Sequence, residues 1–218
     1  GKIKSLDQPV CDYLPEFCDG QNKKLTIRHL LMMSSGLNYD ESYTSLFGPT
    51  TKAYYGTDLK KQMLSLDVVE EPGKNFNYMS SNTQLLAFIL QNATGANISE
   101  YASEKLWKPI GAEMDAQWSL DHTDGNEKAY CCFYSNARDF ARIGQLFLNK
   151  GKWNGKQVVS EEYVNLCTTP APVSDQDKPN SIYGYQWWLT EYQGIKIFYA
   201  RGILGQYIFV IPDLNLVF

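Results

Sequence analysis

The sequence predicts an α+β fold, with helices in the first three quarters of the chain and antiparallel strands in the last. Apolar residues at helical spacing, preceded by capping residues, recur through the first part. β-branched and aromatic runs follow at 182–190, 195–200 and 206–211, separated by glycine-containing turns. No internal repeat is visible, so the pattern predicts a helical region followed by an antiparallel meander.

Capping residues predict the helix boundaries. Thr26 is a suitable N-cap for a helix over 27–34 that ends at Gly36. The clearest helix, 83–93, is apolar almost all round and should be buried, and Gly95 ends it. The other expected helices cover 58–66, 100–107 capped by Ser99, a segment from the cap Ser135 to Asn149, and a short segment starting at Ser160.

Turn signals and polar segments predict the remaining connections. A polar turn near 121–128 predicts a strand pair between 118–120 and 129–134. Asn154-Gly155 is typical of a tight turn. The predicted loops are 37–51, whose residues 38–41 could line a cleft, and the proline-rich 169–180; Pro212-Asp213 should turn into a last strand.

Composition excludes some classes of partner. The 218 residues are 44% hydrophobic and 20% charged, which is ordinary for a globular protein. A net charge of −4 gives no general attraction to nucleic acid or anionic membranes. No apolar run approaches the ~20 residues of a membrane span. We therefore expect neither a nucleic-acid partner nor a membrane span in this chain.

The cysteines and histidines do not form a metal-binding pattern. The chain has five cysteines, with no CxxC pair and no zinc-type spacing, and only two histidines. No metal site or cofactor is expected. Cys11 and Cys18 could form a bridge in an oxidising compartment. Cys131 and Cys132 are interpreted as two buried thiols on a strand.

The stretch over 71–90 is the most suggestive of chemistry, because a turn leads through Tyr78 and small polar residues into the buried helix. A helix N-terminus leaves backbone N–H groups unpaired and favours nearby negative charge. From the residues alone, however, a core role for Tyr78 is favoured, since a phenol with a pKa near ~10 is a poor base without a neighbouring cation. Ser80, Ser81 and Asn82 are explained equally well as competing N-caps.

Residues 201–206, Arg-Gly-Ile-Leu-Gly-Gln, allow two interpretations. The glycines can serve a hairpin turn between two strands. Alternatively, an edge strand here would present a backbone N–H to a substrate while Arg201 holds a carboxylate. The residues alone leave both open.

Several stretches together resemble the penicillin-recognising serine hydrolases, which include class C β-lactamases, D-alanyl-D-alanine carboxypeptidases, esterases and 6-aminohexanoate-dimer hydrolases. The resemblance covers nearly the whole chain in the family's order, and the last stretch most resembles the 6-aminohexanoate-dimer hydrolase branch. The matching stretches are LTIRHLL at 25–31 with SSGL at 34–37, EPG at 71–73 through Tyr78 to TG at 94–95, ARDFARIG at 137–144 with NGK at 154–156, and ARG at 200–202 with Gly205-Gln206 and Pro212.

This resemblance implies that 1–218 is the central and C-terminal part of one β-lactamase-like catalytic domain. Residues 20–134 would form the mainly helical region, and 135–218 a helix with C-terminal antiparallel strands. The implied reaction is hydrolysis of amides or esters through an acyl-enzyme, begun by the serine of an S-x-x-K motif. No lysine of this chain has a serine three residues before it. We therefore expect that motif, and further parts of the domain at both ends, to lie outside these residues, and the chain alone to be inactive.

The resemblance also assigns roles to residues. Tyr78 falls at the tyrosine of the family's Y-x-N motif and would transfer protons, while Ser80 replaces the usual asparagine and, with Asn82, would contact substrate. The family's K-T-G motif corresponds to 200–202, where the cation is displaced by one residue and is an arginine. Arg201 and Gly202 would then bind substrate, and the Ile203 N–H would contribute to an oxyanion hole.

The departures at Ser80 and 200–202 motivate an alternative, a non-catalytic relative that binds a peptide or glycan in the same cleft. A third interpretation is a fragment without a function of its own. As a hydrolase, the protein would act on a small-molecule or peptide substrate. The resemblance implies a periplasmic or otherwise extracytoplasmic location in a bacterium. The sequence names neither the substrate nor the oligomeric state.

Overall fold

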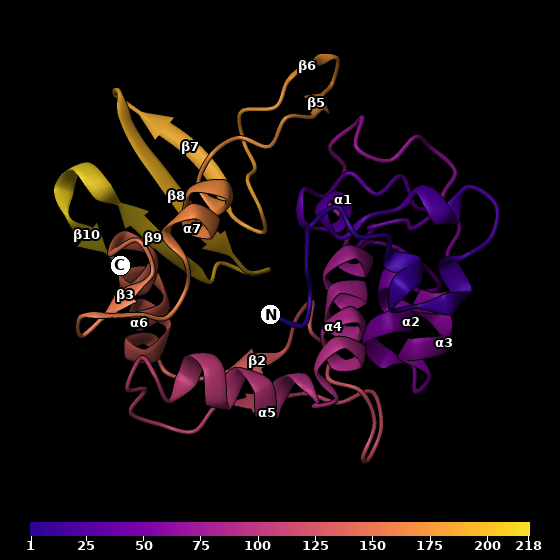
Figure 1. Cartoon of the computed structure of the whole chain (residues 1–218), viewed down its shortest axis with the longest axis horizontal. Coiled ribbons are helices and arrows are strands. Elements are labelled where there is room, and N and C mark those ends of the chain that lie inside the picture. Colours follow the sequence, from indigo (N-terminus) through magenta and orange to yellow (C-terminus); the bar gives the residue numbers. More distant parts are fainter. The chain divides into compact units, whose positions relative to one another are not determined.

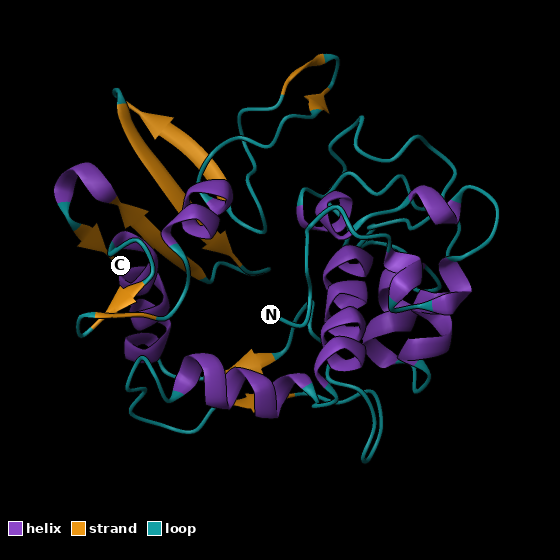
Figure 2. Ribbon diagram, in the orientation of Figure 1, coloured by secondary structure: helices purple, strands orange, loops and turns teal.

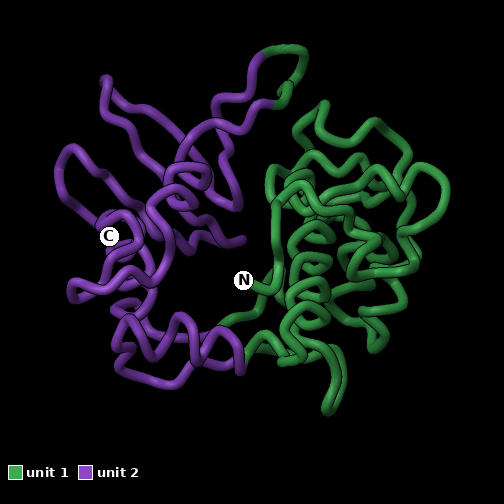
Figure 3. Tube along the Cα trace, viewed as in Figure 1, with its two compact units in different colours: residues 1–99, 118–133, 173–178 green, residues 100–117, 134–172, 179–218 purple.

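The computed structural model describes all residues, 1–218, and divides into two compact units (Figure 3). Unit 1 comprises 1–99, 118–133 and 173–178, and unit 2 comprises 100–117, 134–172 and 179–218. Each unit therefore combines segments that are far apart in the sequence. Helices dominate unit 1, and unit 2 contains an antiparallel sheet, which confirms the α+β class (Figure 2).

The longest helix of unit 1 is α4, with α2 and α3 on one side of it (Figure 1). Helix α4 packs against α1 and α3, and its Leu85, Phe88 and Ile89 are buried. Complete burial of such a side chain contributes about 1.5–3 kcal/mol. The helices are α1 (Ile27–Leu31), α2 (Pro49–Tyr55), α3 (Leu59–Leu64), α4 (Ser80–Thr94) and α5 (Ile98–Ala102), which continues past Ser99 into unit 2; single 3-10 turns cover Val10–Asp12, Pro15–Phe17 and Asn22–Lys24.

Several predicted helix boundaries are confirmed. Thr26 caps α1 by accepting the His29 N–H at 3.4 Å, and the His29 ring accepts the Thr26 N–H in return at 3.2 Å. Gly95 ends α4 with a φ of +75°. Ser160 caps α7 (Glu161–Cys167) through the Tyr163 N–H.

Other boundaries differ from the prediction. Asn136 rather than Ser135 caps α6 (Ala137–Leu148), by accepting the Asp139 N–H at 2.9 Å. Ser99 was expected to cap a helix over 100–107, but it lies inside α5. A π-helical turn over Ser103–Trp107 follows α5 directly. Helix α4 begins three residues earlier than the predicted 83, because a distant carboxylate rather than a local residue caps it.

The main sheet of unit 2 is the predicted meander, with its strands in the antiparallel order β10-β9-β8-β7. Strand β8 lies between β7 and β9, but its pairing with β7 stops at Tyr199, so Ala200 and Arg201 pair with β9 alone. The interpretation of an edge at Arg201 therefore stays a prediction. The strands are β7 (Trp188–Tyr192), β8 (Ile195–Arg201), β9 (Tyr207–Ile211) and β10 (Leu216–Val217), the last reached through a 3-10 turn at Pro212–Leu214. Two-stranded ladders are β1 (Gln117–Trp118) with β2 (Phe133–Tyr134), β3 (Lys152–Trp153) with β4 (Lys156–Gln157), and β5 (Ser174–Asp175) with β6 (Lys178–Pro179).

Helix α6 covers one face of this sheet and approaches it closely at Gly144 (Figure 1). A Cβ atom at Gly144 would lie 2.6 Å from Val217 Cγ1 and 2.9 Å from Ile208 Cγ2. Leu146 and Val210 are fully buried in this layer. The absent side chain of Gly144 therefore sets the helix-to-sheet distance.

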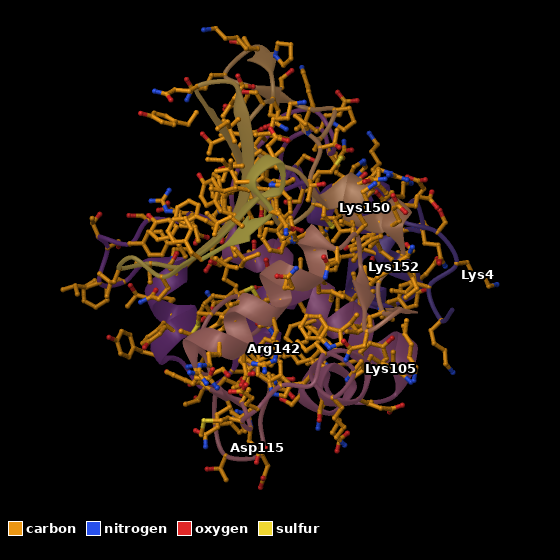
Figure 4. All side chains as sticks on the ribbon, turned by 90° about the vertical axis from the view of Figure 1, so that its left-hand side faces the viewer. Lys4, Lys105, Asp115, Arg142, Lys150 and Lys152 are labelled. Carbon is orange, nitrogen blue, oxygen red and sulfur yellow. A yellow bond between two sulfur atoms is a disulfide. The ribbon has the colours of Figure 1, made fainter.

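The N-terminus of α6 is organised around the buried carboxylate of Asp139. Its two oxygens accept the backbone N–H groups of Glu113 and Met114 at 2.8 and 3.1 Å and the Asn136 side-chain amide at 2.6 Å. Arg142, one turn further along α6 (Figure 4), bonds to Asp139 at 2.9 Å and to Glu113 at 2.6 Å. Burial opposes ionisation, but these hydrogen bonds hold the pKa of Asp139 below its usual value. The ARD stretch thus has a structural role.

The cysteines correct one prediction and fit another. Cys131 and Cys132 are bonded to each other and lie in a turn before β2, so the interpretation as two buried thiols on a strand is wrong. Cys11 and Cys18 form the bridge that the sequence allowed, and Cys167 is a buried free thiol. None of the helices combines the length and apolar character that crossing a bilayer would require.

Candidate active site

Tyr78 lies in unit 1, at the end of an extended segment that leads directly into α4, and is half-buried. The backbone before it is held by two distant parts of the chain. The Phe76 N–H donates to the Ser174 carbonyl at 2.7 Å, and the Asn77 N–H donates to the Met33 carbonyl at 2.7 Å. The position of Tyr78 relative to α4 is therefore fixed by tertiary hydrogen bonds as well as by the helix start.

The first turn of α4 is capped by the carboxylate of Glu41. The Ser80 N–H donates to one Glu41 oxygen and the Ser80 hydroxyl to the other, both at 2.6 Å. The hydroxyl of Tyr43 donates to the same carboxylate at 2.5 Å. Hydrogen bonds to a charged acceptor are roughly twice as strong as neutral ones, and the helix dipole favours an anion here. Ser80 itself is only 5% exposed, so these hydrogen bonds are shielded from water.

The next two residues of α4 point into the core of unit 1. Ser81 and Asn82 are completely buried. The Asn82 amide nitrogen lies 3.3 Å from Met33 Sδ, while the Asn82 side-chain oxygen and the Ser81 hydroxyl have no hydrogen-bond partner. Such unpaired buried groups are rare. In this structure Asn82 is thus an interior residue with an unused acceptor.

Phenol groups surround Glu41 and remain protonated at neutral pH. Burial raises the pKa of Tyr39 to about 12. Burial also raises the pKa of Tyr130, and partial burial and the hydrogen bond to Glu41 raise that of Tyr43. The negative charge of this cluster therefore resides on the carboxylate. The phenols are neutral, and of the three only Tyr43 donates to Glu41.

The lysines of unit 1 do not supply a free cation inside this cluster. Lys74, the lysine nearest to Tyr78 in the sequence, is exposed. Lys128 is buried, but its ammonium donates to the Tyr54 carbonyl at 2.5 Å and lies 5.3 Å from the centre of the Tyr54 ring. A cation able to lower the pKa of a tyrosine here would have to come from another segment.

The remaining predicted site residues lie in unit 2, at the turn between β8 and β9. The Gly202 N–H donates to the Gln206 carbonyl at 2.8 Å, and Leu204 and Gly205 have positive φ values of +66° and +96°. This is the hairpin turn that the glycines allowed. Ile203 is 61% exposed, and its N–H forms no hydrogen bond within the chain.

Arg201 ends β8 opposite Tyr207. Its guanidinium carbon lies 5.9 Å from the centre of the Trp188 ring, and it makes no ion pair in residues 1–218. A guanidinium without an ion-pair partner can donate two parallel hydrogen bonds to a carboxylate.

The structure thus places the six predicted residues in two groups: Tyr78, Ser80 and Asn82 in unit 1, and Arg201, Gly202 and Ile203 in unit 2. Sequence reasoning missed the roles of Glu41 and Tyr43. The only signal was the polar loop over 38–41, which was expected to line a cleft. No three His, Cys, Asp or Glu side chains gather in residues 1–218 in a way that could hold a metal ion.

Comparison with known proteins identifies the class. Residues 2–218 match the family model described as Beta-lactamase, and the chain therefore belongs to this family. The 6-aminohexanoate-dimer hydrolase of Paenarthrobacter ureafaciens is 28% identical over 204 residues, which cover 84% of this chain and 51% of that protein. The chain thus spans about half the length of this curated relative.

Solved structures with a similar fold include relatives of the same kind. A provisionally assigned 6-aminohexanoate-dimer hydrolase from Bacillus anthracis superposes with a TM-score of 0.87 at 25% identity, covering 99% of this chain and 60% of that one. A family VIII carboxylesterase superposes with a TM-score of 0.74 at 18% identity, covering 98% and 69%. The carboxylesterase supports the fold alone.

Proposed function

We propose that this chain is the tyrosine-bearing part of a serine hydrolase that cleaves amide or ester bonds through an acyl-enzyme. The observation that carries the proposal is the placement of Tyr78, half-buried at the end of a tethered segment before α4, in a chain of the Beta-lactamase family. The serine of an S-x-x-K motif outside these residues would attack the carbonyl. Its lysine and Tyr78 would transfer the protons.

Unit 2 offers groups for the other parts of this reaction. The Ile203 N–H, which forms no hydrogen bond within the chain, would donate to the developing oxyanion together with the N–H of the nucleophile. Arg201, which makes no ion pair, would hold a carboxylate of a small-molecule or peptide substrate. Gly202 would contact the substrate beside Arg201, as the resemblance implies.

The test uses the complete polypeptide of which this chain is the proposed part. Tyr78→Phe should lower turnover of amide or ester substrates by ~10²-fold or more, because general acid–base catalysis contributes at least that factor. Tyr192→Phe, at an exposed position of β7, is the matched control and should leave turnover unchanged. Labelling with a fluorophosphonate or penicillin should modify one serine. Folded protein that takes up no label would refute the proposal.

A second candidate is a non-catalytic protein that binds a peptide or glycan. The specific observation in its favour is the engagement of Ser80, whose N–H and hydroxyl both donate to Glu41 and whose side chain is shielded from solvent. A hydroxyl engaged in this way does not offer substrate the reach of the usual asparagine amide. Saturable peptide binding by the complete protein, without turnover or serine labelling, would favour this candidate.

We further propose an extracytoplasmic location. The two disulfides of the chain support it, because such bonds persist mainly in oxidising compartments. Cell fractionation with detection of the protein tests this, and recovery only with the cytoplasm would contradict it.

A further inference from the structure

Two neighbouring cysteines of unit 1 are bonded to each other. The Cys131–Cys132 disulfide closes a small ring across a single peptide bond, with Cα atoms 3.8 Å apart. We propose that this bond is a redox-exchange site, which an external dithiol opens and a disulfide oxidant closes, and that its state changes the conformation of the turn over 128–132. This inference is independent of the hydrolase function.

The backbone at the ring has a conformation that ordinary residues avoid. Cys132 has a φ of +62°, in the left-handed region where a Cβ atom is crowded. Such residues persist only where their surroundings hold them, and they gather at functional and switch positions. Both cysteines are half-buried, so a reductant can approach without unfolding of the core. Opening the ring removes the covalent constraint next to this residue.

The carbonyl groups of both cysteines are acceptors for the neighbouring segment. The Trp118 indole N–H is shared between the Cys131 carbonyl at 2.9 Å and the Lys128 carbonyl at 3.0 Å. The Ser119 N–H donates to the Cys132 carbonyl at 3.0 Å. A change of backbone angles at Cys132 turns these carbonyls away from their donors, so reduction should weaken the attachment of Trp118 and Ser119.

The same turn is attached to α4. Gln84, one helical turn after Ser80, donates to the Glu127 carbonyl at 3.0 Å and accepts the Ala129 N–H at 2.8 Å. Tyr130, directly before the ring, has a buried hydroxyl without a hydrogen-bond partner. A change in the turn can therefore reach the first turn of α4 through Gln84, within unit 1.

No other thiol of the chain is suited to exchange with this bond. Cys167 is buried in unit 2, and burial raises its pKa to about 12, so it remains a thiol rather than a reactive thiolate. Cys11 and Cys18 are already bonded to each other. The exchange partner must therefore come from outside the chain. A dithiol can serve as this partner, because its two thiols together reduce one disulfide.

The exchange conserves atoms and electrons. A thiolate of the dithiol attacks one cysteine sulfur, the Cys131–Cys132 bond breaks, and the released sulfur takes up a proton. The second thiol of the reductant then attacks the reductant sulfur that is bonded to the cysteine. The mixed disulfide breaks, the ring of the oxidised dithiol closes, and the other cysteine is released. The protein gains two electrons and two protons, and the dithiol leaves as its cyclic disulfide.

The experiment titrates the folded complete polypeptide that contains this chain with mixtures of reduced and oxidised dithiothreitol. Free thiols are blocked with N-ethylmaleimide and located by peptide mass spectrometry, so each bond is followed separately. Circular dichroism verifies that the chain stays folded. The peptide with Cys131 and Cys132 should gain two labels reversibly, and exchange of the Ser119 N–H and the Trp118 indole N–H should become about tenfold faster on reduction.

Two variants serve as controls. C131S/C132S should exchange these two protons fast under both conditions, whereas C11S/C18S should keep the full redox response. The proposal is overturned if native chain alkylates at both cysteines without reductant, or if the bond opens only after the chain unfolds. Equal exchange rates in the oxidised and reduced states would overturn it as well.

Discussion

Replacement of Glu41 by glutamine tests how the start of α4 is held. In Glu41→Gln the side chain keeps its size but loses one of its two acceptor oxygens, and its amide N–H₂ then faces a donor. The Ser80 N–H and hydroxyl, which donate to the two Glu41 oxygens at 2.6 Å, can then no longer both donate, and the bond that the N–H keeps is to a neutral amide oxygen. A hydrogen bond to a charged group contributes about 1.5–3 kcal/mol, and the half-buried position of Glu41 favours the lower end.

A loss of about 1.4 kcal/mol corresponds to a tenfold change in an equilibrium constant. Local opening at the first turn of α4 should therefore become about tenfold more frequent. Amide hydrogen exchange measured by NMR reports this opening directly at the Ser80 N–H. The exchange rate of interior α4 amides, such as that of Phe88, should stay unchanged, because the rest of the helix is held by its own packing.

Asp40→Asn is the matched control. Asp40 is the neighbouring acid of the same loop, and its carboxylate accepts the Ser42 N–H at 3.0 Å without contacting Ser80. The control should leave Ser80 exchange at the wild-type rate. An unchanged rate in Glu41→Gln, or an equal acceleration in Asp40→Asn, would refute the assignment of Glu41 as the cap of α4.

Two further predictions concern unit 2. Asp139→Asn should destabilise the chain by about 3 kcal/mol, because its neighbours lose a buried charged partner; Asp115→Asn, at an exposed site (Figure 4), should have almost no effect. Since the folded pKa of Asp139 is lowered, its contribution is present above the unfolded value near ~4 and is lost as the pH falls through the folded value. Urea unfolding at pH 7 and pH 3 should therefore show a smaller difference between wild type and variant in acid, and an undiminished difference would contradict this. Gly144→Val should lower the free energy of unfolding by about 1–3 kcal/mol through overpacking against the sheet. Gln145→Val is the control for the valine itself, and the loss in Gly144→Val should exceed the loss in this control. Equal urea midpoints of the two variants would argue against the close helix-to-sheet contact.

Local signals in the sequence predicted much of the fold. The cap at Thr26 and the left-handed stop at Gly95 lie where they were expected, whereas α1 ends at Leu31, before the expected stop at Gly36. The meander of unit 2 was also predicted, because alternation and turn residues specify antiparallel strands locally. The shift from Ser135 to Asn136 shows the limit, since two adjacent residues with similar capping ability differ only through tertiary bonds.

The missed features depend on contacts that no local pattern encodes. Glu41 and Ser80 are far apart in the sequence, and nothing in the intervening residues indicates that they meet. The bond between Cys131 and Cys132 was missed for a different reason. Adjacent cysteines fit an extended strand as easily as a turn, and the left-handed backbone of Cys132 appears only in the folded structure.

The hairpin over 173–178 has a consequence for the order of folding. It belongs to unit 1, where Ser174 accepts the Phe76 N–H at 2.7 Å and donates to the Lys74 carbonyl at 2.9 Å. These bonds join residues about a hundred positions apart, and such distant pairing forms slowly. During synthesis at ~5–20 residues per second, the segment before Tyr78 waits several seconds for its partner strand to leave the ribosome. The helices around α4 can assemble earlier, whereas the support of Tyr78 is among the last parts of unit 1 to form.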